Sequence, residues 1–152
     1  MNYWLFKTEP SECSIDDFAR APTTPIVWEG VRNYQARNFL RDGVVVGDQV
    51  LIYHSSCKDI GVAGIAEVVR AAYADPSQFD PRSPYYDAKS SPQQPRWVAV
   101  DLRFVNKLPR LITLDKIKSS AKMAELPVAQ KGSRLSVMPV TIQQWRDLLA
   151  LQ

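Results

Sequence analysis

The segment from Trp28 to Arg41, WEGVRNYQARNFLR, contains side chains that are well suited to hold a flat, negatively charged ligand. Aromatic rings can stack on a heterocycle, amide side chains can hydrogen-bond to its edge, and guanidinium groups can pair with phosphates. Trp28 is followed by Gly30, and a tryptophan on a turn where the backbone can approach closely could form a wall for such a ring. The segment therefore indicates a binding site.

The same segment predicts an amphipathic helix. Ala36, Phe39 and Leu40 recur at the spacing of one helix face and can be buried. The opposite face carries Tyr34, Arg37, Asn38 and Arg41. Asn33 can cap the first turn, and Gly43 is expected to end the helix. One face would hold the fold while the other remains available to a ligand.

Each of these residues also has a purely structural explanation. Trp28 could be a core residue, Asn33 only a helix cap, and the arginines a solvated helix surface. Taken together, the rings, amides and clustered cations favour a site over those separate explanations.

The composition is typical of one globular domain over residues 1–152. A net charge of +3 and a pI near 8.9 permit binding to a polyanion without requiring it. The apolar runs are too short to cross a bilayer, and the beginning, MNYWLFKTEP, lacks the pattern of a signal peptide. We therefore expect a cytoplasmic protein without a membrane role.

Cysteine and histidine usage restricts the possible chemistry. Cys13 and Cys57 fit reduced thiols, and a single histidine, His54, cannot build a Cys/His zinc site. His54 precedes Ser55 and Ser56, but neighbours in sequence do not establish a nucleophile and base pair in space. We therefore expect His54 to be structural or part of a pocket, and expect no metal.

Alternating and helical patterns predict an α+β fold built on a curved, mostly antiparallel sheet or barrel. The predicted strands are 3–8, 49–54, 61–70, 97–105 and 134–140, and the predicted helices begin at caps Ser14, Asn33, Thr113 and Thr141. Gly64 inside a strand predicts a bulge or tight curvature. The proline-rich segment 75–95 is either a functional loop or a flexible insertion.

Seven sequence blocks in the same order resemble one known family. They are WLFKTEP (4–10), WEGVRNYQARNFLR (28–41), GDQVLIYHSS (47–56), GVAGIAEVV (61–69), SPYYD (83–87), RWVAVD (96–101) and RLSVMPV (134–140). Across nearly its whole length the chain resembles the EVE domain, a PUA-like barrel related to YTH domains. The resemblance implies a PUA-like β-barrel flanked by short helices, with a cleft for a modified base flipped from DNA or exposed in RNA.

Matching positions and side-chain chemistry together give the expected site. The base pocket is expected to contain Thr8, Glu9, Trp28, Asn33, Tyr34, His54, Ser55 and Ser56. Phosphates are expected to contact Lys7, Arg32, Arg37, Arg41 and Arg134. The resemblance implies nucleic acid as the partner and no catalysis, and we expect no cofactor.

Two other functions stay open. Lys7, Glu9 and His54 could serve a nuclease or another enzyme in the same cleft, because PUA-like folds also include ribonuclease-type members. Alternatively, the arginines are merely solvated and the domain binds a small ligand or a protein. The sequence leaves open the base modification, the choice between DNA and RNA, and the oligomeric state.

Overall fold

Six strands form one sheet in the order β2-β5-β4-β3-β1-β6, and only β1 and β3 pair in parallel. The computed structural model describes all residues 1–152. Its strands are β1 (Tyr3–Thr8), β2 (Ile26–Trp28), β3 (Gln49–His54), β4 (Gly61–Ala74), β5 (Val98–Thr113) and β6 (Val137–Val140). Its α-helices are α1 (Ile15–Arg20), α2 (Tyr34–Asp42), α3 (Leu114–Ser119) and α4 (Ile142–Leu149).

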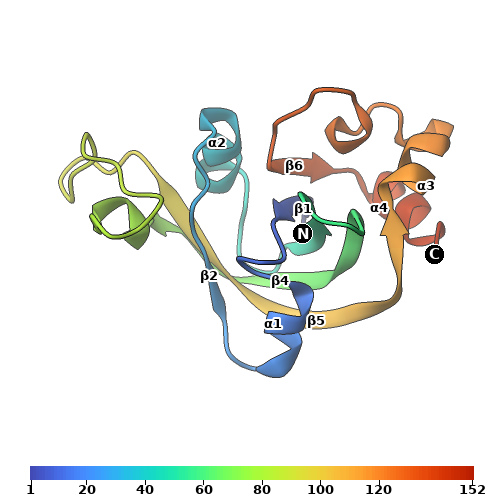
Figure 1. Ribbon diagram of the computed structural model, residues 1–152, viewed down its shortest axis with the longest axis horizontal. Coiled ribbons are helices and arrows are strands. Elements are labelled where there is room, and N and C mark those ends of the chain that lie inside the picture. Colours follow the sequence, from blue (N-terminus) through green and yellow to red (C-terminus); the bar gives the residue numbers. More distant parts are fainter.

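The predicted α+β class with a curved, mostly antiparallel sheet is confirmed. In Figure 1 the long strands β4 and β5 bend around β1, and the short helices lie at the ends and sides of this curved sheet. The outer strands β2 and β6 do not pair with each other, so the barrel is open. Every helix of the structure is too short or too polar to span a membrane.

The helix boundaries agree with the predicted caps. Ser14 and Thr141 each form a capping box, and Asn33 and Thr113 each accept a hydrogen bond from the first turn of their helix. Helix α2 ends at Gly43, as predicted. These boundaries were predictable because a cap acts within three residues of itself.

Two strands extend beyond their predicted ends, and one is shorter. A further strand, β2, was not predicted: Trp28, expected on a turn, ends this strand and pairs with Val100. β4 and β5 pair from Gly61 with Thr113 to Ala74 with Val98, so cross-strand hydrogen bonds continue where the alternating pattern fades. The register between them shifts at Gly64, which confirms the predicted irregularity. β6 begins only at Val137, the partner of Phe6 in β1, rather than at residue 134.

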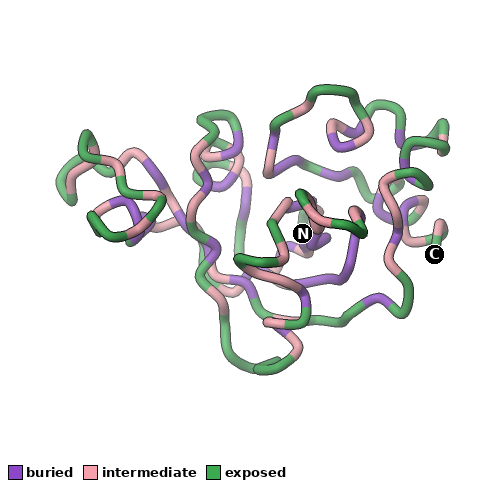
Figure 2. Tube along the Cα trace, viewed as in Figure 1, coloured by how far each residue is buried: buried purple, intermediate pink, exposed green.

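A single cluster of 33 buried residues forms the core, and Figure 2 shows buried positions along the strands with exposed positions in the outer loops. Segment 75–97, which includes the 3₁₀ turn Pro76–Phe79, is fixed to the sheet by buried polar groups. The Gln78 side chain donates to the backbone oxygens of Asp75 and Trp97 at 2.8 Å each. The remaining 3₁₀ turns are Ala121–Met123 and Pro127–Ala129.

Candidate functional site

A cavity of about 900 Å³ opens beside the ends of β1 and β3. Eighteen residues line it, and seven of them were predicted as site residues: Lys7, Thr8, Glu9, Trp28, Ser55, Ser56 and Arg134. Small-molecule pockets commonly have volumes of about 300–1,000 Å³, so the space is sufficient for a nucleobase and its sugar.

The parallel pairing of β1 with β3 brings two of these groups together. Thr8 is the register partner of His54, and the Ser55 amide donates to the Thr8 oxygen at 2.9 Å. Ser55 and Ser56 therefore follow β3 at the same edge where Glu9 follows β1. Ser56 has a positive φ of 54°, so the backbone turns sharply at the cavity wall.

Trp28 belongs to both the core and the cavity wall. Only 6% of its surface is exposed, and its ring stacks on Phe18 with centroids 6.3 Å apart. Trp28 can therefore be a core residue and a site residue at once, because one part of a buried ring can still line a cavity.

Tyr85 is a second aromatic residue of the wall that the sequence analysis did not assign to the site. Gly30, with a φ of +85°, lies so close that a Cβ at this position would be 2.7 Å from Tyr85 Cε2. The Arg32 guanidinium lies over the Tyr85 ring at 5.5 Å and donates to the Tyr85 backbone oxygen. The only feature of the sequence that pointed to Tyr85 was its place in the block SPYYD.

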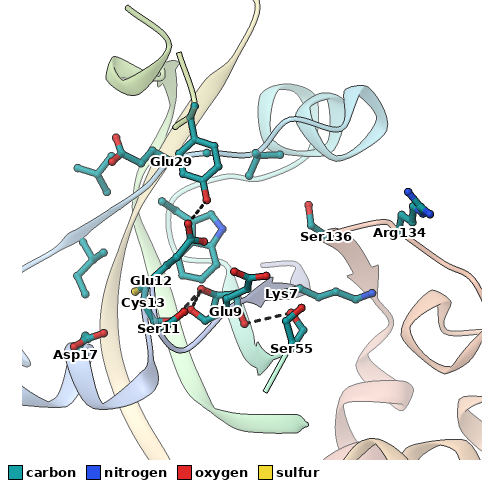
Figure 3. A pocket seen from close by; sticks show the side chains of 18 residues that line it. Lys7, Glu9, Ser11, Glu12, Cys13, Asp17, Glu29, Ser55, Arg134 and Ser136 are labelled. Atoms are coloured by element: carbon teal, nitrogen blue, oxygen red, sulfur yellow. Dashed lines mark hydrogen bonds between the residues drawn. The ribbon is translucent and has the colours of Figure 1, made fainter. Parts of the chain in front are cut away.

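The cavity carries charges of both signs. Its cations are Lys7 and Arg134, and its carboxylates are Glu9, Glu12, Asp17 and Glu29. In the view of Figure 3, Lys7, Arg134 and Ser136 lie on one side, and Glu12 and Glu29 lie on the other. The sequence analysis predicted both cations but did not identify Glu12, Asp17 or Glu29.

Burial changes the proton affinity of several groups at this site. Desolvation lowers the pKa of Lys7 and raises the pKa of Glu29, which Asp75 raises further and Arg32 partly offsets. Burial and the hydrogen bond to Glu12 raise the pKa of Tyr85 to about 12. At neutral pH the Tyr85 hydroxyl is therefore protonated and acts as a donor.

Three residues predicted for the base pocket lie outside this cavity, and each has another partner. The Asn33 side chain accepts from the Ala36 amide at 2.9 Å, and Tyr34 stacks on Trp97 with centroids 4.7 Å apart. His54 Nε2 accepts from the Ile15 amide at 3.1 Å, which directs the imidazole to α1. Tyr34 is nevertheless 52% exposed.

The three arginines near α2 that were predicted to contact phosphate also lie outside the cavity. Arg32 pairs with Asp75 at 2.9 Å, and Arg41 pairs with Asp42 at 2.9 Å. Arg37 donates to the Arg96 backbone oxygen at 3.0 Å. Lys7 and Arg134 are consequently the cations available at the cavity itself, and neither forms an ion pair.

Two kinds of reactive group would indicate chemistry at the cavity, a metal-binding cluster and an activated thiol. Nowhere do three or more His, Cys, Asp or Glu side chains converge to hold a metal ion. Cys13 lines the wall, but burial and the nearby Asp17 and Glu12 raise the pKa of its thiol to about 11. The thiol is therefore protonated at neutral pH and is a poor nucleophile.

The open, curved sheet is consistent with the class of protein that a comparison with known families identifies. The EVE domain family matches residues 2–151, and the chain belongs to this family. This confirms the resemblance that the seven sequence blocks indicated.

Individual relatives agree with this assignment. Thymocyte nuclear protein 1 of Gallus gallus is 39% identical over 166 residues, which cover 99% of this chain and 68% of that protein. A crystal structure of a protein from Pseudomonas putida superposes with a TM-score of 0.94 at 53% identity, covering 98% of both chains. Human THYN1 in complex with DNA containing 5-methylcytosine gives a TM-score of 0.89 at 36% identity, covering 99% of this chain and 97% of the human one.

Proposed function

We propose that this protein binds nucleic acid and accommodates a modified base in the cavity, without catalysing a reaction. One observation carries the proposal: human THYN1, which has the same fold, was solved in complex with DNA containing 5-methylcytosine. The cavity of this chain, with Trp28 and Tyr85 in its wall, is large enough for such a base.

The cavity offers each interaction that such a ligand needs. Trp28 and Tyr85 supply aromatic surface, and stacking contributes about 1–3 kcal/mol per base. Lys7 and Arg134 can neutralise phosphates adjacent to the bound base. Polar side chains at the wall can hydrogen-bond to the edge of the base, and these bonds would distinguish one base from another.

A panel of otherwise identical oligonucleotides that carry different modified bases, in DNA and in RNA, tests the proposal. Binding is measured at two salt concentrations. We expect at least one modification to bind more tightly than its unmodified parent, with an affinity that falls as salt rises and a preference that changes much less. Equal affinity for every modified and unmodified base would contradict the proposed base pocket.

Trp28→Phe is the matching variant, because an alanine would also remove a core side chain at a cost of about 3–5 kcal/mol. The smaller ring should keep the fold and weaken binding of the modified base. Unchanged affinity in a folded Trp28→Phe protein would show that the larger indole surface is not required, and unchanged affinity in a folded Trp28→Leu protein, which has no aromatic ring, would exclude a direct stacking role for Trp28.

The two alternatives have less support from the geometry. Lys7 and Glu9 line the cavity, whereas His54 is tied to α1, so the three residues of the nuclease alternative do not converge. Turnover of a nucleic-acid substrate that is lost in Glu9→Gln with binding retained would favour the enzyme. Absence of binding to every oligonucleotide would favour a small-ligand or protein-binding domain.

A further inference from the structure

The acidic side of the cavity is the feature that phosphate binding does not explain. Four carboxylates and only two cations line the cavity as a whole. Phosphates are bound by cations, and nearby carboxylates weaken that contact. Asp17 already caps α1 through Ser14, so Glu9, Glu12 and Glu29 are the carboxylates that can have a role toward a bound nucleotide.

Glu12 is a cavity carboxylate that another residue of the cavity wall holds in place, whereas Asp17 is held within α1 by Ser14 and Arg20. The Tyr85 hydroxyl donates to Glu12 Oε1 at 2.5 Å, and both residues line the cavity. Tyr85 is itself fixed by close packing on Gly30 and by Arg32, which donates to its backbone oxygen at 2.8 Å. An otherwise exposed glutamate thus becomes a preorganised acceptor, with its second carboxylate oxygen free.

The arrangement of charge suits one orientation of a nucleotide. A nucleotide whose phosphate lay near Lys7 and Arg134 would extend its base toward the side that carries Glu12 in Figure 3. An ionised carboxylate only accepts hydrogen bonds, so it can pair with a base edge that presents N–H groups. Cytosine and adenine present an exocyclic amino group, whereas thymine presents the acceptor O4 at the equivalent position.

We propose that Glu12, held by Tyr85, accepts a hydrogen bond from the exocyclic amino group of the bound base. The cavity therefore selects amino-bearing bases over thymine and uracil. This inference depends on the proposed function, because it assigns the base edge that the cavity recognises.

The test compares 5-methylcytosine with thymine, which both carry the 5-methyl group. Each is placed opposite an abasic site in otherwise identical duplexes, so that neither base is paired in the other strand. We expect the unmodified protein to prefer 5-methylcytosine by about tenfold or more, because thymine would leave two acceptors facing each other. Equal affinity for the two duplexes would overturn the inference and leave the proposed function standing.

Variants then assign the preference to Glu12. Glu12→Gln supplies a donor as well as an acceptor, so the preference should fall to within about twofold. Glu125→Gln makes the same charge change at an exposed position outside the cavity and should retain the full preference. Tyr85→Phe keeps the ring but releases the carboxylate, and should reduce the preference partially.

The outcomes are distinguishable once circular dichroism has shown that each variant is folded. If Glu12→Gln keeps the preference for 5-methylcytosine over thymine, the inference is overturned. It is also overturned if Glu125→Gln loses this preference to the same extent as Glu12→Gln. Failure of the unmodified protein to bind any oligonucleotide overturns the proposed function and this inference with it.

Discussion

Arg32 and Asp75 form an ion pair of 2.9 Å that connects the turn before α2 with the segment after β4. The carboxylate of Asp75 is completely buried, and it also accepts hydrogen bonds from the Gly30 amide and from Ser77. The Arg32 guanidinium also donates a hydrogen bond to the backbone oxygen of Tyr85. Arg32, which was predicted to contact phosphate, thus holds two parts of the cavity wall together.

Replacing Arg32 with Met should destabilise the protein by about 3–5 kcal/mol. The change leaves a buried carboxylate without its counter-charge, and that desolvation cost is not recovered elsewhere. The free energy of unfolding in urea measures the effect. A loss below about 1 kcal/mol would show that the pair is not a structural requirement.

Gly30→Ala should be more destabilising than Gly47→Ala, although both glycines have positive φ values, of 85° and 94°. Each substitution incurs about 1–2 kcal/mol of backbone strain. Only at Gly30 does the added Cβ meet Tyr85, whereas at Gly47 it meets nothing within 4 Å. Thermal and urea unfolding compare the two variants, and equal losses would show that Tyr85 adjusts without cost.

The same pair of variants also tests the cavity. Gly30→Ala should weaken binding to the best modified oligonucleotide because Tyr85 is displaced, and Gly47→Ala should leave binding unchanged because Gly47 lies outside the cavity. Loss of affinity in both folded variants would indicate a general effect of backbone strain.

Local signals explain which parts of the fold were predictable. Helix α2 was predicted with its caps Asn33 and Gly43 because capping depends on neighbouring residues. The group formed by Lys7, Thr8 and Glu9 came from the family resemblance, and the parallel register of β1 and β3 then places it beside Ser55.

The remaining features depend on contacts that span long stretches of sequence. Arg32 meets Asp75 across 43 residues, and Tyr85 meets Glu12 across 73. No local periodicity reports such partners, so the arginine appeared free and the glutamate appeared unremarkable in the sequence. The helical pattern correctly predicted that the face with Arg37 and Arg41 is polar, but it could not show that this face lies outside the cavity.

Folding stability should decrease in mild acid because of His54. Burial is the main cause that lowers the folded-state pKa of His54 below its ordinary value of 6.5, and Lys107 lowers it further against the opposing effects of Asp16 and Asp17. As pH falls through 6.5, the unfolded chain therefore takes up a proton that the folded protein resists. The contribution is full above that pH and is lost progressively below it, down to the folded-state pKa.

His54→Leu isolates this effect, because His54 is the sole histidine. At pH 7.5 the variant should be less stable by about 1–3 kcal/mol, since the Ile15 amide loses its acceptor. Between pH 7.5 and 5.5 its unfolding free energy should change less than that of the unmodified protein. Parallel pH curves for the two proteins would show that another group is responsible.

Arg134 and Arg41 make different predictions for the salt dependence of nucleic-acid binding. Arg134 lines the cavity without an ion-pair partner, whereas Arg41 lies outside it and pairs with Asp42. If the cavity is the binding site, Arg134→Gln should weaken binding to all sequences and reduce the slope of log affinity against log salt by about 1. Arg41→Gln removes the same formal charge and should change the slope much less. An equal or larger effect at Arg41 would indicate that the phosphates contact the exposed face of α2 and not the cavity.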